Sequence, residues 1–476
     1  MQNEPRSAAS PSGLAFLLAL TATFAGCGGG SSASGTSGPT AGGGAAAGNT
    51  AAGGTTDTLS PAAQLGEKLF EDRALSVSGK QSCATCHVKA YAFAADPTAS
   101  GPDHGLPVSL GGPNMDQPGF RNTPSLMYGS YAPAFYFDSD GGPNGGFFRD
   151  GRAATLADQA IDPFTTSFEM ANADATAVVD RLKTRPYLAD FQALYGAAVL
   201  ADSQTALQRM GAAIAAYETE SSEFHPFSSK YDYVLAGKAS FTPQERRGLA
   251  LFNNPTKGNC AACHPSTSAN GSTAPLFTDF SFDNLGVPRN AVIAANSDTS
   301  APTYTPTNGT DGVHAYYDLG ICGPLRDNGN LNVAGICGQF KVPTLRNVAV
   351  TAPYFHNGRF TTLKDTIGFY VRRDTNPDEW FPVLQDGTTT KFDDLLALYG
   401  GQFTVTANEP GSDAGYLGNV NTSEIPYNRS IGDTPALSEQ EINDLITFLC
   451  TLTDGYDPAK PNAQVLPAQC QAAVSP

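Results

Sequence analysis

The chain has 476 residues, with 28 Lys and Arg against 45 Asp and Glu, so its formal net charge is −17. Its length favours at least two domains, and a hydrophobic fraction of 41% is enough for globular cores. The acidic balance argues against binding to nucleic acid, which needs Lys and Arg to contact phosphate. No uninterrupted apolar run approaches the roughly 20 residues that cross a bilayer, which excludes a polytopic membrane protein.

The first residues have the pattern of an export signal. Residues 14–24 form a short apolar stretch followed by Ala25-Gly26-Cys27, which is typical of a signal peptide. Residues 24–27 resemble a bacterial lipobox, in which the Cys becomes lipidated, although Phe24 stands where Leu is usual. An ordinary Cys27 near the cleavage site is the alternative. We therefore expect residues 1–27 to direct export to the periplasm, with a lipid anchor at the outer membrane or surface if Cys27 is modified.

Residues 28–56 are almost entirely Gly, Ala, Ser and Thr. Such a segment cannot bury enough apolar surface to offset its ordering entropy. The composition therefore predicts a flexible linker ahead of the globular part of the chain.

Two pentapeptides indicate the main chemistry, Cys-Ala-Thr-Cys-His at 83–87 and Cys-Ala-Ala-Cys-His at 260–264. Cys-x-x-Cys-His is the attachment signature of c-type haem, in which two thiols add to the porphyrin and the His ligates the iron. The expected attachment and ligand residues are Cys83, Cys86, His87, Cys260, Cys263 and His264. Zinc would need two further ligands per site, and no second Cys or His pair lies at a matching distance. A redox-active Cys pair would explain neither the His nor the duplication.

Four of the nine cysteines remain after Cys27 and the two motifs are set aside: Cys322, Cys337, Cys450 and Cys470. An even remainder in an exported protein favours two disulfides. Proximity in sequence favours Cys322–Cys337 and Cys450–Cys470 among the three pairings. Free buried thiols are the alternative.

The segments before the two motifs resemble each other. Residues 59–70 and 241–252 each open with Ser or Thr followed by Pro, which is typical of a helix N-cap and first turn. Both carry Gly at the same place and end in Leu-Phe. Two unrelated amphipathic helices are the alternative, but the parallel haem motifs favour duplication. We therefore expect a mainly α chain with two cytochrome c-like haem domains and long loops, at residues 57–237 and 238–476.

Other helices are expected at residues 155–159, 177–217 and 438–452 because their apolar residues have helical spacing. The last of these begins with Ser438 and Glu441, which form a capping-box pattern. Residues 101–119 and 408–435 are rich in Gly, Pro, Asn and Asp, so they are expected to be loops.

Further motifs make residues 59–454 similar to the bacterial dihaem cytochrome c peroxidase/MauG family. These motifs are Arg-Asn-Thr-Pro-Ser at 121–125, Asp-Gly-Arg-Ala at 150–153, Gln-Ala at 159–160, Glu-Met at 169–170, residues 340–347 and Pro-Tyr-Phe-His at 353–356. The resemblance implies that the haem on His87 takes peroxide. It also implies that the haem on His264 stores or relays an electron.

The resemblance assigns roles around both haems. Glu169 matches the family's distal carboxylate, and Gln159 and Pro163 match its other distal positions. Cleavage of the peroxide bond moves a proton from the inner to the outer oxygen, and one carboxylate can perform both transfers. Position 370, fourteen residues after His356, holds Met in the family's peroxidases and Tyr in its MauG-like members. Tyr370 is therefore expected to ligate the second iron, where a phenolate stabilises the oxidised state; packing in a helix is the alternative.

The family also binds calcium between its haems. The matching groups are the side chain of Asn122 and the main-chain carbonyls of Thr351 and Pro353, and oxygen donors suit calcium. A turn role for Asn122 is the alternative.

Two positions bear on activation and electron transfer. Peroxidases that need reductive activation have a His that blocks the first iron, and His104 is the only candidate here. Given Tyr370, we expect an open first iron and leave His104 out of the ligands. The Trp that commonly precedes Asp-Gly-Arg is replaced by Arg149, and the sole Trp is Trp380. Electrons are then expected to tunnel directly or to hop through Tyr or Phe.

The resemblance implies a haem peroxidase with hydrogen peroxide as substrate. Its electron donor would be a small cytochrome or a copper protein, or it would oxidise a protein substrate as MauG-like enzymes do. Residues 372–382 and 419–433 are similar to the methanobactin-associated MbnH branch, which oxidises a partner protein. A non-catalytic dihaem electron carrier is the alternative, and it would leave Glu169 without a role. The family often forms homodimers, but the sequence leaves the oligomeric state open.

Overall fold

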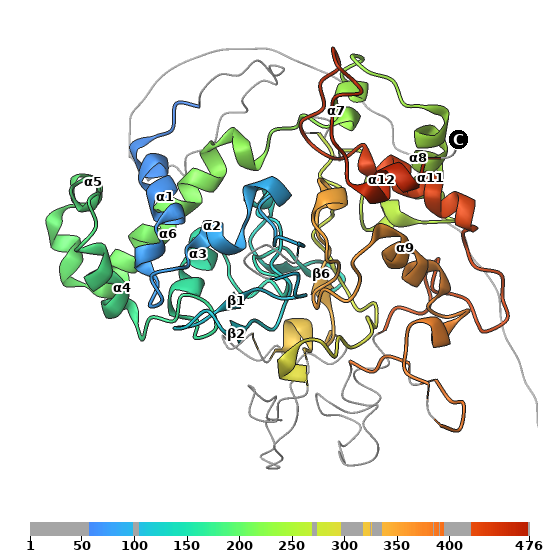
Figure 1. The fold of residues 1–476 in the computed structure, drawn as a ribbon, viewed down its shortest axis with the longest axis horizontal. Helices are drawn as coiled ribbons and strands as arrows, with labels where there is room; N and C mark the ends of the chain where they lie inside the picture. The colour runs from blue at the N-terminus through green and yellow to red at the C-terminus, as the bar shows by residue number, and fades with distance from the viewer. Residues whose placement is uncertain are drawn as a thin grey trace, which may run out of the picture. The chain divides into compact units, whose positions relative to one another are not determined.

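Helices make up most of the regular structure in the computed structural model, which confirms the mainly α prediction (Figure 1). The structure describes residues 57–98, 104–268, 274–296, 318–323, 325, 336–383, 385–389, 391–394 and 420–474. The predicted signal segment, Cys27 and the linker 28–56 lie outside the described residues. None of the described helices is long and apolar enough to cross a membrane.

The elements fall into two sets along the chain. The α-helices before the second motif are α1 (Pro61–Glu71), α2 (Cys83–Cys86), α3 (Leu156–Thr165), α4 (Ala175–Leu182), α5 (Leu188–Tyr195), α6 (Ser203–Glu220), α7 (Lys230–Leu235) and α8 (Pro243–Asn253). Those after it are α9 (Leu363–Arg372), α11 (Glu439–Cys450) and α12 (Ala468–Ala472). Short 3-10 helices span Arg73–Leu75, Lys89–Tyr91, Gly129–Tyr131, Ala197–Ala201, Ser222–Phe224, Cys260–Ala262, Ala294–Asn296, Gly320–Cys322, Val348–Val350 and Pro377–Glu379.

Three short antiparallel pairs supply the described sheet structure. They are β1 (Leu110–Gly111) with β2 (Gln117–Pro118), β3 (Tyr136–Phe137) with β4 (Pro143–Asn144), and β5 (Phe282–Asp283) with β6 (Phe340–Lys341). The first pair interrupts the loop predicted at 101–119. The third pair joins segments more than fifty residues apart. Its residues Asp283, Phe340 and Lys341 border the cavity that contains both Cys-x-x-Cys-His motifs.

The predicted helix starts are confirmed. The Ser60 hydroxyl accepts from the Ala63 amide, and Pro61 follows it in the first turn. Thr242 forms a capping box with Glu245, and Ser438 forms one with Glu441. The expected helix at 177–217 is instead divided into α4, α5 and α6. The breaks fall around Pro186, which cannot donate a helical hydrogen bond, and at Gly196, which has a φ of 80°.

The two halves repeat one helix crossing. A Cβ on Gly66 of α1 would lie 2.0 Å from the carbonyl oxygen of Ala213 on α6. A Cβ on Gly248 of α8 would lie 2.1 Å from the carbonyl oxygen of Asp444 on α11. Each pair of helices therefore packs backbone against backbone at the glycine that the two segments share, which supports the duplication.

The core has a matching aromatic cluster in each half. Phe70 packs edge-on against Phe93 at 6.2 Å and against Tyr217 at 5.7 Å. In the second half, Phe252 packs at 6.0 Å from Phe277 and at 5.2 Å from Phe448.

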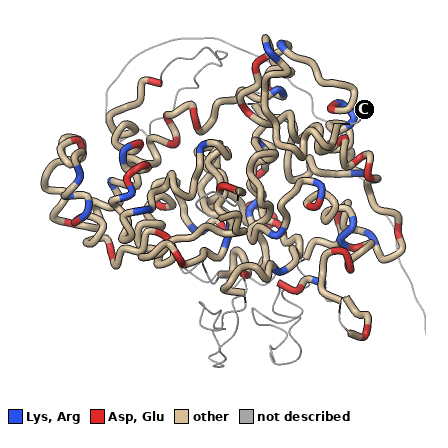
Figure 2. Tube along the Cα trace, in the orientation of Figure 1, with Lys and Arg blue, Asp and Glu red and all other residues tan. Residues whose placement is uncertain are grey.

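Both predicted disulfides are present, Cys322–Cys337 and Cys450–Cys470. The second connects α11 to α12. Both signs of charge are interspersed along the described elements (Figure 2).

Candidate active site

One continuous cavity of about 740 Å³ takes in both Cys-x-x-Cys-His motifs. Cys86 and His87 border it from the first motif, and Cys260, Cys263 and His264 border it from the second. The wall between them comes from both halves of the chain. The cavity therefore brings together two sites that are 177 positions apart in sequence.

The two histidines are held in the same way. His87 Nδ1 is 2.9 Å from the carbonyl oxygen of Phe93, and His264 Nδ1 is 2.8 Å from that of Phe277. A carbonyl fixes Nδ1 as the protonated nitrogen, so Nε2 is left free for iron. Burial lowers the pKa of both rings, which favours the neutral form that binds metals. Phe93 and Phe277 both have left-handed backbones, with φ of 53° and 54°.

The four motif thiols are not paired with one another. Burial raises the pKa of Cys83, and it raises the pKa values of Cys260 and Cys263 to about 12. Zinc binds thiolate, so these raised pKa values disfavour a zinc site. Within the described part of the chain, no three His, Cys, Asp or Glu side chains form a metal-binding group. The donor set therefore fits two covalently attached haems.

Glu169 lies in the turn after α3, and its side chain borders the cavity on the side of the first motif. The Gly112 amide donates to the Glu169 carbonyl at 2.8 Å, and a Cβ on Gly111 would lie 2.9 Å from Glu169 Cα, so β1 supports this turn closely. Burial raises the pKa of Glu169 to about 7, while the nearby Arg152 guanidinium acts in the opposite direction. The carboxyl can therefore gain or lose a proton near neutral pH.

The other predicted distal residues lie on the same wall. Gln159 and Pro163, both on α3, border the cavity with Glu169. The Pro163 carbonyl accepts from the Met170 amide at 3.1 Å, which ties α3 to the Glu169 turn. His104, in contrast, is exposed and does not border the cavity.

Tyr370 lies on α9 and borders the cavity on the side of the second motif. Burial is the largest cause that raises its pKa, and the neighbouring Cys263 and Asp283 raise it further. Its ring lies 5.7 Å from Phe355 and 5.9 Å from Tyr427. The structure thus places Tyr370 beside the second motif. Trp380 packs in an aromatic cluster behind α9 and does not border the cavity.

The predicted calcium groups meet where the two halves join. Asn122, Thr351 and Pro353 all border the cavity, and the Asn122 side chain contacts the Pro353 carbonyl. The backbone N–H of Asn122 also donates to the His356 carbonyl at 2.7 Å. His356 is buried and its ring stacks on Phe340 at 3.8 Å.

Arg149, at the position where the resemblance led us to compare a Trp, borders the cavity. It donates from Nε to the Asn122 carbonyl at 3.0 Å, and its own carbonyl accepts from the Lys341 amide at 2.8 Å. Burial and the nearby Arg121 lower the pKa of Arg149 to about 10, and burial lowers that of Lys341 to about 8. Arg149 and Lys341 therefore place two half-buried cationic side chains at this part of the junction, where an indole was the comparison.

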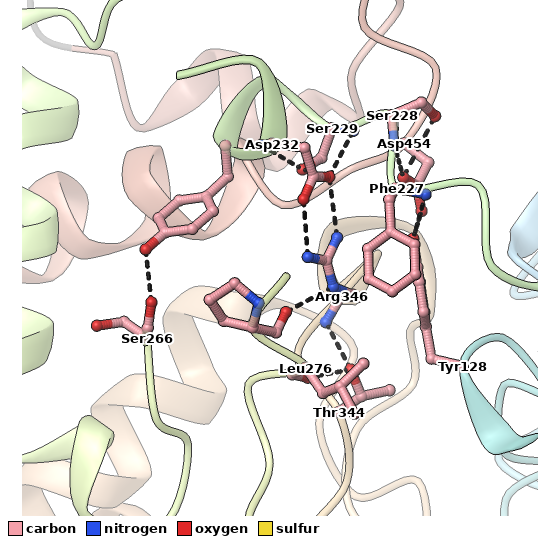
Figure 3. A network of polar contacts seen from close by, with 12 residues as sticks. Tyr128, Phe227, Ser228, Ser229, Asp232, Ser266, Leu276, Thr344, Arg346 and Asp454 are labelled. Atoms are coloured by element: carbon pink, nitrogen blue, oxygen red, sulfur yellow. Dashed lines mark hydrogen bonds and ion pairs between the residues drawn. The ribbon is translucent and has the colours of Figure 1, made fainter. Parts of the chain in front are cut away.

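A second polar network stabilises the same junction (Figure 3). Arg346 is 1% exposed and donates to both carboxylate oxygens of Asp232, at 2.9 and 2.8 Å. Its guanidinium lies 4.9 Å from the Tyr128 ring and 4.6 Å from the Phe227 ring. The Tyr128 hydroxyl donates to Asp454 at 2.7 Å, so this network connects residues of both halves.

Sequence reasoning missed several residues that shape the site. Phe93 and Phe277 could have been found only by knowing which carbonyl each histidine meets. Arg346 lies within the recognised segment 340–347, but nothing in the pattern marks it as buried. Glu218, which also borders the cavity, has no sequence signal apart from its place on an amphipathic helix.

Comparisons with known proteins agree with this geometry. The family described as Di-haem cytochrome c peroxidase matches residues 60–240. The methylamine utilization protein MauG of Paracoccus denitrificans is 41% identical over 313 residues, which cover 65% of this chain and 73% of that protein. A cytochrome-c peroxidase of Denitromonas iodatirespirans is 30% identical over 335 residues, 69% of this chain and 78% of that protein.

Solved structures share the fold. The dihaem peroxidase BthA of Burkholderia thailandensis has a TM-score of 0.67 and 36% identity, covering 84% of this chain and 88% of its own. A MauG-like protein associated with microbial copper homeostasis, at 23% identity, has a TM-score of 0.50 and shares the fold. The chain therefore belongs to the dihaem cytochrome c peroxidase/MauG family and is a haem oxidoreductase with two c-type haems.

Proposed function

We propose that the chain reduces hydrogen peroxide at the first haem site and receives electrons through the second. The observation that carries this proposal is the half-buried Glu169 carboxyl, which shares a cavity wall with His87 and whose pKa is raised by burial to about 7. A carboxyl with this pKa is present in both protonation states near neutral pH, as a proton shuttle requires. A non-catalytic electron carrier needs no proton shuttle at a substrate position.

In this proposal, ionised Glu169 accepts the proton of the inner peroxide oxygen and returns it to the outer oxygen as the O–O bond breaks. The outer oxygen leaves as water. Two electrons and two further protons are then needed to convert the inner oxygen to a second water. A haem held by Cys83, Cys86 and His87 would supply the iron and the redox chemistry at this site. Gln159 borders the cavity, and its side-chain amide can form a hydrogen bond with the substrate. Pro163 also borders the cavity and has no backbone N–H to donate.

At the second site, we propose that His264 and Tyr370 would hold the haem iron. Support comes from the position of Tyr370 on the cavity wall beside Cys263. A phenolate ligand stabilises oxidised iron. This arrangement suits an enzyme that keeps oxidising equivalents available to a partner.

We propose a calcium ion at the junction of the two halves, bound by Asn122, Thr351 and Pro353. Support comes from the meeting of the Asn122 side chain and the Pro353 carbonyl in a buried place, where Asn122 Nδ2 donates to that carbonyl; a calcium ion there would replace this hydrogen bond and would need Asn122 Oδ1 as its ligand. The haem domains are proposed to be residues 57–237 and 238–476, with His356 and Arg149 at their junction.

The proposed location is the periplasm, following export by residues 1–27, with Cys27 as the site of a lipid anchor. The reducing partner is proposed to be a small cytochrome or copper protein. The alternative within this proposal is a protein substrate. It follows from Tyr370, which stands at the position where MauG-like members of the family carry Tyr.

Rapid mixing of the haem-loaded protein with equimolar hydrogen peroxide tests the proposal. We expect the spectrum of one haem to change within the mixing experiment and two electrons from a reduced donor to be consumed per peroxide. A spectrum that does not respond to peroxide, before and after reduction of the second haem, would show a carrier instead. Mass spectrometry of a co-purified protein, before and after peroxide, separates donor oxidation from side-chain modification.

A further inference from the structure

Glu218, near the end of α6, is an acidic side chain that the proposed peroxide reaction does not use. It is 3% exposed and borders the cavity beside the first motif. Neither of its carboxylate oxygens has a hydrogen bond to any described residue, and Oε2 is fully enclosed. An unpartnered buried carboxyl is costly, so its presence on the cavity wall needs an explanation.

The internal repeat shows what the fold itself requires at this position. On α6, the glycine of α1 meets Ala213 and Tyr217; on α11, the glycine of α8 meets Asp444 and Phe448. Glu218 follows Tyr217, and Leu449 follows Phe448. Both Glu218 and Leu449 border the cavity. The second half therefore fills the equivalent position with a leucine that is 5% exposed. An apolar side chain can therefore fill this position, so packing alone does not explain why the first half has a glutamate there.

The charged groups near Glu218 determine whether its protonation can follow the charge of the haem. Burial alone raises its pKa to about 8. On the cavity side, Glu218 interacts electrostatically with the Cys83 thiol of α2. This thiol becomes an uncharged thioether when haem is attached. The charged groups on the elements packed against α6 are Glu67, Lys68 and Glu71 on α1, Asp158 and Asp162 on α3, Asp180 and Arg181 on α4, and Glu223 in the 3-10 helix that follows.

We propose that Glu218 binds a proton when the first haem is reduced and releases it when that haem is oxidised. A haem in the ferric state carries one more positive charge than in the ferrous state, so it favours the ionised carboxylate. When one electron arrives from the donor, that stabilisation is lost and one proton is taken up. The uptake of one electron and one proton together leaves the net charge of the first haem site unchanged. This inference rests on a haem at the first motif and does not require that Glu169 act on peroxide.

The experiment measures the reduction potential of the first haem against pH in the haem-loaded protein. It is done in the Glu169→Gln background, so that the other cavity carboxyl does not contribute. We expect the potential to fall as pH rises, by at most about 59 mV per pH unit, which corresponds to a tenfold change in a one-electron equilibrium. Adding Glu218→Leu should abolish this slope, because leucine is the residue that the second half carries there. The second haem's potential should keep its own pH dependence.

Glu218→Gln provides a second variant of the same size, and Glu67→Gln on the exposed face of α1 is the matched control. Infrared difference spectra should show a protonated carboxyl band that appears on reduction, persists in Glu67→Gln and is absent from both Glu218 variants. A slope and a band that survive both Glu218 variants would overturn the proposal. Peroxide reactivity is measured separately in the protein that keeps Glu169: if that protein does not react with peroxide while the Glu169→Gln protein keeps the slope, the peroxidase reaction is refuted and Glu218 remains the proton site.

Discussion

Replacing Glu169 with Gln tests the proton transfer directly. Only the carboxylate can accept the proton of the inner peroxide oxygen, so the reaction rate follows the ionised fraction. Burial raises the pKa of Glu169 to about 7. Roughly 9% of the groups are then ionised at pH 6 and roughly 91% at pH 8, so the rate constant should rise about tenfold between these values. Glu169→Gln should lower the rate constant by about 10²- to 10⁴-fold and remove this rise.

The assay is stopped-flow absorbance of the haem bands with excess peroxide, which gives a second-order rate constant at each pH. Glu67→Gln is the control, since that carboxylate is exposed on α1 and away from the cavity. Arg152→Leu adds a second check: the Arg152 guanidinium lowers the pKa of Glu169, so its removal should move the midpoint to higher pH. A Glu169→Gln protein that reacts at the normal rate, or that keeps the same pH profile, would refute the reasoning.

Three further predictions concern other parts of the site. Arg346→Met leaves Asp232 buried without its partner and should lower the free energy of unfolding by about 3–5 kcal/mol in urea titrations; a loss below about 1 kcal/mol would contradict the assigned ion pair. Tyr370→Met should raise the reduction potential of the second haem, measured by redox titration, and an unchanged potential would show that Tyr370 is not bound to iron. His104→Ala should leave the resting absorbance spectrum and the peroxide rate constant unchanged, because His104 is exposed outside the cavity; a new high-spin component would identify it as a ligand.

Local sequence patterns predicted much of the fold because their causes are local. Ser60, Thr242 and Ser438 begin helices through side-chain hydrogen bonds that reach only three residues ahead. The two disulfides join cysteines 15 and 20 residues apart, so proximity alone selected the correct pairs.

The residues that sequence reasoning missed depend on contacts between distant segments. Phe93 follows its histidine by six residues and Phe277 follows its own by thirteen, yet both carbonyls perform the same task. The unequal spacing hides this equivalence from any alignment of the two halves. Glu218 illustrates the same point, since a Glu two residues from a helix end is ordinarily solvated. Only the way α6 crosses α1 turns it toward the cavity.

With haem bound as proposed, the first iron would have a coordination position open to peroxide, and His264 and Tyr370 would both ligate the second. Electron paramagnetic resonance of the oxidised, haem-loaded protein before and after one equivalent of peroxide tests this most directly. We expect one high-spin and one low-spin ferric signal, with the high-spin signal lost when peroxide is added. Two low-spin signals that peroxide leaves unaltered would contradict it.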